Sequence, residues 1–404
     1  VSALGFITQT ISVNNQSEIK IQLEVDITQL DAVTLNAGYY TVKDKERTGN
    51  ISKVKQSDIE LQPISNPLAA LQGRVAGVEI TQTSGVPGAG FDIKIRGQNS
   101  IRTNGNEPLY IIDGVPYASE TLGDQQTSAS IIPGIGFSPL NNISPSDIES
   151  IEILKDADAT AIYGSRGANG VVLITTKKGK SGSTSFGLNI STGFGSVANR
   201  MDLLSTSEYL EMRREAYAND GINPLPFNAY DINGTWDETR ETDWQKELFG
   251  KTAYLTNVQG LFSGGSEQTQ FLISGNYNKQ ATVFPGDFDN NNISVLSNLN
   301  HKSKDDRLSL QFSANYTSNT NNLPATDLIR EALRLAPNAP NLYNDDGTLN
   351  WENSTWNNPL RNLEGKYLAN GSSLISHVSM DYKIYKELHF STSLGYTQVF
   401  ISCT

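Results

Sequence analysis

The C-terminal half of the chain alternates apolar and polar residues over long stretches. In RLSLQFSANYTSN, every second residue from Leu308 to Tyr316 is apolar or aromatic, and the residues between them are Ser, Gln and Asn. A period of two predicts a β-strand with one apolar and one polar face. The pattern recurs in about seven stretches of about 9 to 13 residues, a length that crosses a bilayer at a tilt. These stretches are 186–194, 254–262, 270–278, 293–299, 307–319, 374–384 and 388–396.

Two architectures fit such strands: a transmembrane β-barrel, and a soluble β-sandwich with one wet face. The barrel is favoured because the strands exceed the ~5 to 6 residues typical of soluble sheets. Their polar faces also carry Ser, Asn, Gln and Thr rather than Lys and Glu, and aromatic residues recur near their ends. Those aromatic residues are Tyr254, Phe262, Phe271, Tyr277, Tyr316, Tyr382, Tyr385 and Tyr396. No apolar run approaches the roughly 18 to 20 residues of a spanning helix, so we expect any membrane span to be a β-barrel.

Two long inserts separate these strands. LSTSEYLEMRREAY at Leu204–Tyr217 predicts a surface helix capped by Ser205 or Ser207. The segment 321–372 contains a second short helix, ATDLIREALRLAP, and a loop that bears Trp351 and Trp356. Such a loop either binds an external ligand or partner, or packs its aromatic residues on itself.

The N-terminal half mixes short strands with short helices, which predicts an α+β domain. NPLAALQGRVAGVEI reads as a helix at Pro67–Leu71 followed by a strand, FDIKIRG as another strand, and PLYIIDGVP as a strand ended by a turn at Asp113 and Gly114. We expect these strands to form one small mixed sheet. The segment 117–142 lacks periodicity, so it is either a functional loop or a flexible surface excursion.

The segment IEILKDADATAIYGSRGANGVVLITTKKGK reads as strand, helix, glycine turn and strand in succession. The helix is expected to be capped by Asp156 or Asp158 and broken at GSRGANG, where Gly164, Gly167 and Gly170 permit left-handed or close-packed backbone. VVLITT is short and β-branched, which predicts a buried strand.

Four blocks of this half, 71–80, 84–101, 108–116 and 143–170, occur in the order and wording of a known family. The chain resembles the N-terminal part of the SusC/RagA-type TonB-dependent outer-membrane transporters, and the four blocks resemble their plug domain. The resemblance implies an α+β plug followed by antiparallel strands of a transmembrane β-barrel. The residues that carry the plug signature are Arg96, Gly97, Asp113, Gly114, Tyr163, Gly164, Arg166, Gly167, Asn169 and Gly170.

The resemblance also divides the chain into four regions. Residues 1–27 resemble the C-terminal remnant of a carboxypeptidase-regulatory-like β-sandwich, 28–58 form a linker, 59–180 form the plug, and 181–404 form the first part of the barrel. Because large plugged barrels have about 22 strands, about seven strands make a partial barrel. We therefore expect the chain to be a fragment that cannot transport by itself.

Within the linker, LDAVTLNAG at Leu30–Gly38 occupies the place of the family's TonB box. An extended peptide of this kind can add a strand to a partner's sheet through main-chain hydrogen bonds. The alternative is that these residues complete the preceding β-sandwich. The candidate TonB-box residues are Leu30, Asp31, Ala32, Val33, Thr34 and Leu35.

The resemblance implies an outer-membrane location and a nutrient importer whose plug gates the barrel lumen. The implied partners are the periplasmic C-terminal domain of TonB, a SusD-like surface lipoprotein, outer-membrane lipid, and a glycan or peptide substrate. A net charge of −12 and a pI near 4.8 argue against nucleic acid as a partner. The alternative function is that of a secreted or surface β-rich binding or adhesion protein without transport activity.

Patterns of catalysis, cofactor binding and metal binding are missing from the sequence. It contains no G-x-S-x-G, no H-E-x-x-H and no Walker loop. The single cysteine, Cys403, excludes a disulfide framework, and His301, His377 and His389 lie far apart. DFDNNN at 287–292 begins like a calcium loop but lacks its Gly and Glu, which favours a polar hairpin loop. We expect neither an enzyme nor a bound metal or cofactor.

Overall fold

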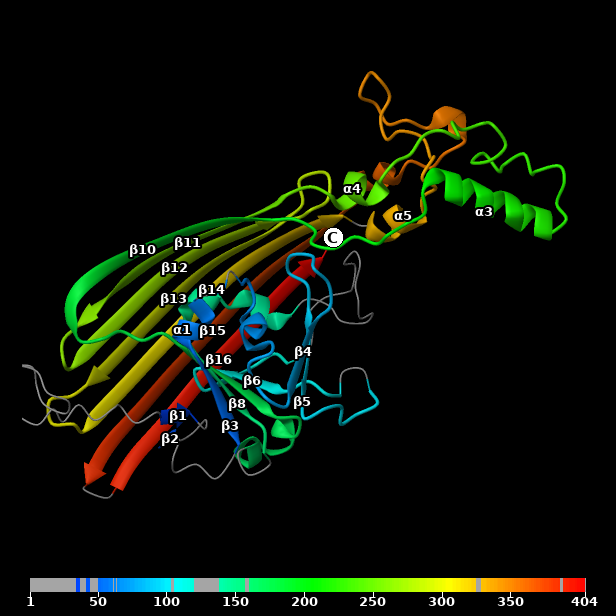
Figure 1. Cartoon of the computed structure of the whole chain (residues 1–404). Coiled ribbons are helices and arrows are strands. Elements are labelled where there is room, and N and C mark those ends of the chain that lie inside the picture. Colours follow the sequence, from blue (N-terminus) through cyan, green and yellow to red (C-terminus); the bar gives the residue numbers. More distant parts are fainter. Residues whose placement is uncertain are drawn as a thin grey trace, which may run out of the picture.

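The chain contains an α+β domain, which we call the plug domain, and a long antiparallel sheet, which we call the wall sheet. The computed structural model shows the plug domain lying against one face of the wall sheet (Figure 1). The residues that the structure describes are 34–36, 41–43, 50–60, 62, 64–102, 105–119, 138–156, 160–324, 328–385 and 388–403.

The plug domain is built on a five-stranded sheet with the order β3-β8-β9-β6-β7. Its strands are β3 (Ile51–Lys55), β6 (Leu109–Ile112), β7 (Val115–Tyr117), β8 (Ile148–Leu154) and β9 (Val171–Thr176). β6 and β9 run parallel and the other neighbours antiparallel, so the sheet is mixed, as predicted.

Two of the strands predicted for this sheet lie elsewhere. β4 (Val78–Gln82) and β5 (Phe91–Ile95) pair only with each other, in a separate two-stranded sheet. The expectation of one sheet was wrong because the apolar side chains of this hairpin, including Ile80 and Ile93, pack directly into the main core. Core packing, rather than an extended hydrogen-bond ladder, therefore holds β4 and β5 in place.

β3 lies in the segment 28–58, which was predicted to be a linker without a core. Ile51 and Val54 are instead buried, and β3 pairs antiparallel with β8 along its whole length. The plug sheet therefore begins upstream of the predicted boundary at residue 59. A short helix, α1 (Gln56–Glu60), follows β3 immediately.

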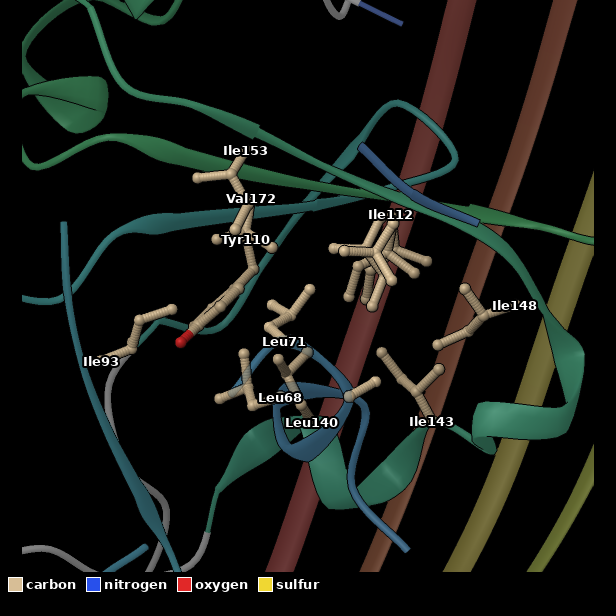
Figure 2. Packing of buried hydrophobic residues seen from close by; sticks show 14 of the residues in the cluster. Leu68, Leu71, Ile93, Tyr110, Ile112, Leu140, Ile143, Ile148, Ile153 and Val172 are labelled. Atoms are coloured by element: carbon tan, nitrogen blue, oxygen red, sulfur yellow. The ribbon is translucent and has the colours of Figure 1, made fainter. Parts of the chain in front are cut away.

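The main core lies between the five-stranded sheet and two short 3-10 helices, η2 (Pro67–Leu71) and η3 (Pro139–Asn142). A third 3-10 helix, η4 (Pro145–Asp147), follows η3. Figure 2 shows Ile112, Ile153 and Val172 from the sheet packed toward Leu71 and Leu140 from the helices. Each fully buried side chain of this kind contributes about 1.5–3 kcal/mol of transfer free energy. The helix predicted at Pro67–Leu71 is confirmed; Asn66 caps it by accepting a hydrogen bond from the Leu68 amide at 2.8 Å.

The opposite face of the sheet carries a smaller apolar cluster that includes Ile51, Leu154 and Leu173, with Tyr163 packed against it. Tyr163 belongs to the 3-10 helix η5 (Ala161–Gly167). The predicted break at GSRGANG is confirmed at Gly164, whose backbone is non-helical (φ 60°, ψ −146°). A second helical turn follows and ends at Gly167. The predicted cap Asp158 lies outside the described residues.

The wall sheet has seven antiparallel strands, each paired with the next along the chain. They are β10 (Gly182–Gly195), β11 (Ala253–Gly265), β12 (Thr269–Ala281), β13 (Asp289–Lys302), β14 (Leu308–Pro324), β15 (Lys366–Tyr385) and β16 (Leu388–Cys403). They form a partial barrel, as predicted. The strands run 13 to 20 residues, longer than expected. The strands continue through terminal segments such as 318–322, in which the residues on both faces are polar. The sequence therefore shows no alternation of apolar and polar residues there.

The two faces of the wall sheet differ in polarity as the alternation predicts. The face toward the plug domain buries polar side chains such as Ser274, Asn276 and Thr317. The opposite face exposes apolar side chains on every strand, among them Leu188, Phe262, Ile273, Val295, Tyr316, Val378 and Leu394. The predicted girdle aromatics are exposed except Phe271, whose ring lies 5.4 Å from that of Phe262.

The inserts fold at one end of the wall strands (Figure 1). They contain α3 (Thr206–Asn219), α4 (Trp244–Phe249), α5 (Leu328–Arg334), η6 (Glu352–Ser354) and η7 (Pro359–Glu364). Ser205 caps α3 in a reciprocal capping box with Glu208, which confirms the predicted helix and selects between its two candidate caps. Trp356 is buried 5.9 Å from the ring of Trp244, whereas Trp351 is exposed.

Upstream of the plug domain, β1 (Thr34–Asn36) pairs antiparallel with β2 (Thr41–Lys43). The predicted strands of residues 1–27 lie outside the described residues. Among the helices that the structure describes, none combines the length and the apolar composition needed to cross a bilayer.

Candidate functional site

The interface between the plug domain and the wall sheet is built largely from amide and hydroxyl groups. Asn292 of β13 donates a hydrogen bond to the main-chain oxygen of Asn141 at 2.6 Å, and Thr317 of β14 donates one to that of Asn142 at 2.6 Å. These wall side chains therefore hold the η3 segment by its backbone. Polar docking of this kind can be exchanged for water at a smaller cost than an apolar core.

Further contacts join other segments of the plug domain to the wall sheet. The Tyr117 hydroxyl donates to Ser373 on β15 at 3.2 Å, and Asn321 on β14 donates to the main-chain oxygen of Pro87 at 3.3 Å. Burial raises the pKa of the Tyr117 hydroxyl, which therefore stays protonated as a hydrogen-bond donor. Ile375 of β15 adds an apolar contact with the main core.

Asp147, at the end of η4, places a carboxyl group in the interface. Its side chain is fully buried, accepts a hydrogen bond from the Asn276 amide at 2.7 Å and contacts the Gln259 amide at 3.5 Å. Burial raises the pKa of the Asp147 carboxyl, although hydrogen bonds from wall side chains, including Asn276, oppose the shift. Sequence reasoning missed Asp147, because an Asp after Ser-Pro-Ser reads as a turn residue.

Gly88 is a second interface residue that sequence reasoning missed. It adopts φ +76°, and a Cβ built there would lie 2.7 Å from the Asn321 amide nitrogen and 3.0 Å from that of Asn290. Gly88, the middle glycine of SGVPGAG, therefore lets the plug backbone approach the wall closely. The only sequence signal was the glycine run itself.

The predicted signature residues lie at turns of the plug domain and in η5. Gly114 lies near the wall sheet, and the others make none of the wall contacts described above. Arg96 and Gly97 form the turn after β5, both at positive φ (62° and 89°). Arg96 forms an ion pair with Asp156, which also accepts a hydrogen bond from the Asn50 amide at 2.8 Å. That backbone hydrogen bond, together with Arg96, lowers the pKa of the Asp156 carboxyl. The pair ties the β4-β5 hairpin to the end of β8.

Asp113 and Gly114 form the tight turn between β6 and β7, again at positive φ (48° and 86°). The Asp113 carboxylate accepts hydrogen bonds from the Thr176 amide at 2.9 Å and hydroxyl at 2.6 Å, and so fixes the end of β9. A Cβ built on Gly114 would be 3.8 Å from the His377 ring on β15. The strand-ending turn predicted here is confirmed, and its tip faces the wall.

The remaining signature residues belong to η5 and the turn after it. Tyr163 covers the smaller apolar cluster, Gly164 carries the kink, and the exposed Arg166 and the buried Gly167 end the helix. Asn169 donates hydrogen bonds to the main-chain oxygens of Gly105 at 2.9 Å and Glu107 at 3.3 Å.

Gly170 connects η5 to β9 in a place where no side chain fits. It adopts φ +94°, and a Cβ there would lie 2.7 Å from Ile95 Cδ1 and 3.1 Å from the Leu154 oxygen. At these positions, the signature residues serve to set the backbone geometry of the plug domain.

Four candidate TonB-box residues, Leu30 to Val33, lie outside the described residues. Thr34 and Leu35 lie in β1, which pairs with β2. The backbone of this segment is thus extended, as strand addition requires. The role of the segment stays a prediction.

Side chains that could bind a metal ion are not clustered in the part of the chain that the structure describes. Within it, no group of three or more His, Cys, Asp or Glu side chains is placed to hold a metal ion. His301, His377 and His389 lie on the separate strands β13, β15 and β16, and His377 contacts Ser393 at 2.9 Å.

Comparisons with known proteins agree with this architecture. The family model described as TonB-dependent Receptor Plug Domain matches residues 43–171. TonB-dependent receptor P26 of Formosa agariphila is 36% identical over 375 residues, which cover 90% of this chain and 34% of that protein. TonB-dependent receptor SusC of Bacteroides thetaiotaomicron is 31% identical over 424 residues, which cover 98% of this chain and 39% of that protein.

Solved structures share the fold. The RagAB peptide importer in its open-open state aligns with a TM-score of 0.71 and 23% identity, covering 91% of this chain and 42% of that chain. This chain thus spans roughly a third of the length of the curated relatives it matches. The chain therefore carries a plug domain of the TonB-dependent receptor family and, over nearly its whole length, is similar to part of SusC and related TonB-dependent receptors.

Proposed function

We propose that the chain forms the plug and the first wall strands of an outer-membrane importer of nutrients. The observation that carries this proposal is the inverted burial of the wall sheet, whose polar face is covered and whose apolar face is open. Leu394 is 69% exposed and Phe186 is 70% exposed. In a water-soluble sandwich the apolar face would be the covered one. Hydrocarbon is the environment that an exposed apolar face of this extent fits.

The plug domain would close the lumen, and its contacts support a plug that can be displaced. The hydrogen bonds from Asn292, Thr317 and Asn321 reach main-chain oxygens of the plug domain, so each can be replaced by a water molecule. The function is gated passage without chemistry on the cargo, and we assign no enzymatic activity.

Energy coupling would act through residues 30–35 in the predicted linker 28–58. We propose that this segment adds a strand to the periplasmic domain of TonB, and that β3 transmits the load to the plug sheet. The extended β1 and the position of β3 directly downstream support this assignment. The plug domain would then consist of β3 and the region 59–180. Residues 181–404 would form the wall, and residues 1–27 would form the end of a preceding β-sandwich.

The inserts at one end of the wall would face the outside and contact a SusD-like lipoprotein or the cargo. Trp351 is 45% exposed there, as an aromatic residue that meets a ligand or partner would be. Oligosaccharides and peptides are the two cargo classes. The RagAB structure is described as that of a peptide importer, which supports the second class.

The coupling proposal is tested in the receptor that carries this chain. Deleting Leu30–Gly38 should abolish energised uptake and leave cargo binding at the cell surface unchanged. Leu35→Pro should act like the deletion because proline removes a main-chain donor, whereas the matched Leu35→Val should retain uptake. Unchanged uptake after the deletion would contradict the assignment.

Location separates this proposal from a secreted adhesion protein. Fractionation should recover the receptor in the outer membrane, with a gel mobility that changes on heating. Recovery as a soluble species with unchanged mobility would favour the adhesion protein.

A further inference from the structure

A polar cleft of about 570 Å³ lies between the plug sheet and the wall sheet. The plug side contributes Lys53, Glu152 and Thr175, and the wall side contributes Gln311, Ser313 and Ser379. Its volume falls in the ~300 to 1,000 Å³ range of small-ligand sites. Both walls therefore offer hydrogen-bonding groups to whatever occupies the cleft.

The plug sheet changes character where it faces this cleft. Under η5, its surface is apolar and is covered by Tyr163. Two residues further along three neighbouring strands, the same face carries Lys53, Glu152 and Thr175. Side chains two apart on a strand share a face, so this is a switch from apolar to polar within one continuous surface. Packing alone would have been served by apolar residues at these positions.

Glu152 has an acceptor atom that the protein leaves unused. Its side chain is fully buried, and Oε1 receives the Lys53 ammonium at 2.9 Å and the Ser150 hydroxyl at 3.0 Å. Oε2 has no hydrogen-bond partner among the described residues. A buried carboxylate oxygen without a donor costs free energy unless an occupant of the cleft supplies the donor.

We propose that the cleft is a subsite for a hydrogen-bond-donating group of the cargo, and that displacement of the plug domain from the wall sheet exposes the buried Glu152 Oε2 as its acceptor. This inference rests on the proposed import function. Lys53 already offsets the charge of Glu152, so the subsite selects neutral donors, namely hydroxyl or amide groups, over free cations. A bound metal ion does not fit, because no group of three carboxylate, His or Cys ligands exists in the described part of the chain. Sugar hydroxyls and peptide amides share the required chemistry.

The first test measures uptake in the receptor that carries this chain. Glu152→Gln replaces one carboxylate oxygen by a donor and should lower energised uptake about tenfold or more, the loss expected for a hydrogen bond to a charged group. Cargo binding at the cell surface without energy should stay unchanged. Glu79→Gln, at an exposed carboxylate on β4, is the matched control and should behave like the parent. Uptake by a folded Glu152→Gln receptor at the parental rate would overturn the proposal.

The second test keeps Glu152 intact, so it is independent of how that variant folds. In a Cys403→Ser background, Ser379→Cys places a thiol on the wall of the cleft, and its labelling by a methanethiosulfonate reagent is timed. Maltotriose should slow labelling if the cargo is a glycan, and trialanine should do so if it is a peptide. If neither probe changes the labelling rate while uptake still depends on Leu30–Gly38, the subsite is refuted and the import function stands. Uptake that is absent or independent of that segment would instead refute the import function.

Discussion

Replacing Asp147 by Ala should loosen the plug domain from the wall sheet. The carboxylate is fully buried, accepts a hydrogen bond from Asn276 at 2.7 Å and contacts Gln259 at 3.5 Å. Truncation removes both acceptor atoms, so Asn276 loses its one short hydrogen bond and keeps only the 3.3 Å contacts with Ser274 and Ser294, while Gln259 keeps the main-chain oxygen of Ser146 at 3.2 Å. The Asp147 main-chain oxygen still accepts its hydrogen bond from the Lys177 amide at 2.8 Å, so the local backbone keeps its anchor.

The expected cost follows from the hydrogen bonds that the carboxylate makes. One short hydrogen bond to a charged group is worth about 1.5–3 kcal/mol. Its loss leaves no unpaired charge, because the donors to Asp147 are neutral amides. The long contact with Gln259 adds little, and the desolvation that raises the Asp147 pKa outweighs the hydrogen bonds that lower it, so the net cost lies at the low end. We therefore expect Asp147→Ala to lower the free energy of plug unfolding by about 1–2 kcal/mol at neutral pH. Asp147→Asn keeps one carbonyl acceptor and should cost about half as much.

The pH dependence has a defined sign. Because burial raises the Asp147 pKa, the folded protein holds this proton more tightly than the unfolded chain does. The stability from this proton is fully present below the unfolded pKa of about 3.9 and is lost as the pH rises through the folded pKa. The destabilisation caused by either variant should therefore be largest in acid and smaller at neutral pH.

Pulse proteolysis in a urea series measures plug unfolding in the detergent-solubilised receptor. The Asp147→Ala midpoint should fall, Asp147→Asn should lie between it and the parent, and the exposed Glu79→Ala should match the parent. A parental midpoint for Asp147→Ala, within about 0.5 kcal/mol, would show that the carboxylate does not hold the interface.

Two further predictions concern the plug signature. Gly170→Ala should destabilise the plug domain more than Gly73→Ala. Both variants strain a positive φ, but the new Cβ at Gly170 also meets Ile95. The same urea series measures the difference, and equal midpoints would contradict the steric argument. Asp113→Ala and Thr176→Val should each lower plug stability, with a coupling energy of about 1–3 kcal/mol in a double-mutant cycle; additive effects would show that their hydrogen bonds do not stabilise the turn.

Periodicity predicted the wall sheet well because one apolar face suffices to reveal a strand. From Leu308 to Tyr316 the alternation is unbroken, and β14 covers this stretch. The last residues of β14, such as Asn319 and Asn321, pair with β15 but are polar on both faces. Hydrogen bonding to a neighbour makes them a strand, and a single sequence does not reveal that neighbour.

Sheet membership in the plug domain was harder to predict because the partners are distant in sequence. Ile51 pairs with Leu154, and the short run ISKVK carries no local sign of this pairing. The hairpin of β4 and β5 has the composition of a sheet strand, yet its side chains fill the core instead. Local composition reports that a strand exists but does not identify its partner.

The candidate site was predictable in part. Glycines and turn residues such as Gly170 and Asp113 stand out in the sequence because their backbone conformations are unusual. Asp147 and Glu152 do not stand out, because a carboxylate in a turn or strand is normally solvated. The tertiary structure buries both, Asp147 against side chains of the wall sheet and Glu152 beside Lys53 and Ser150 of the plug domain.

The two sheets differ in the distance along the chain between paired strands, and this sets the order in which they can fold. Each strand of the wall sheet pairs with its sequence neighbour, so the wall can grow hairpin by hairpin. In the plug sheet, β9 lies at the centre between β8 and β6 but comes last in sequence. During synthesis from the N-terminus, the plug sheet therefore stays incomplete until Thr176 has emerged. Until then β6 and β8 lack their central partner, and their unpaired edges are open to aggregation or to binding by chaperones.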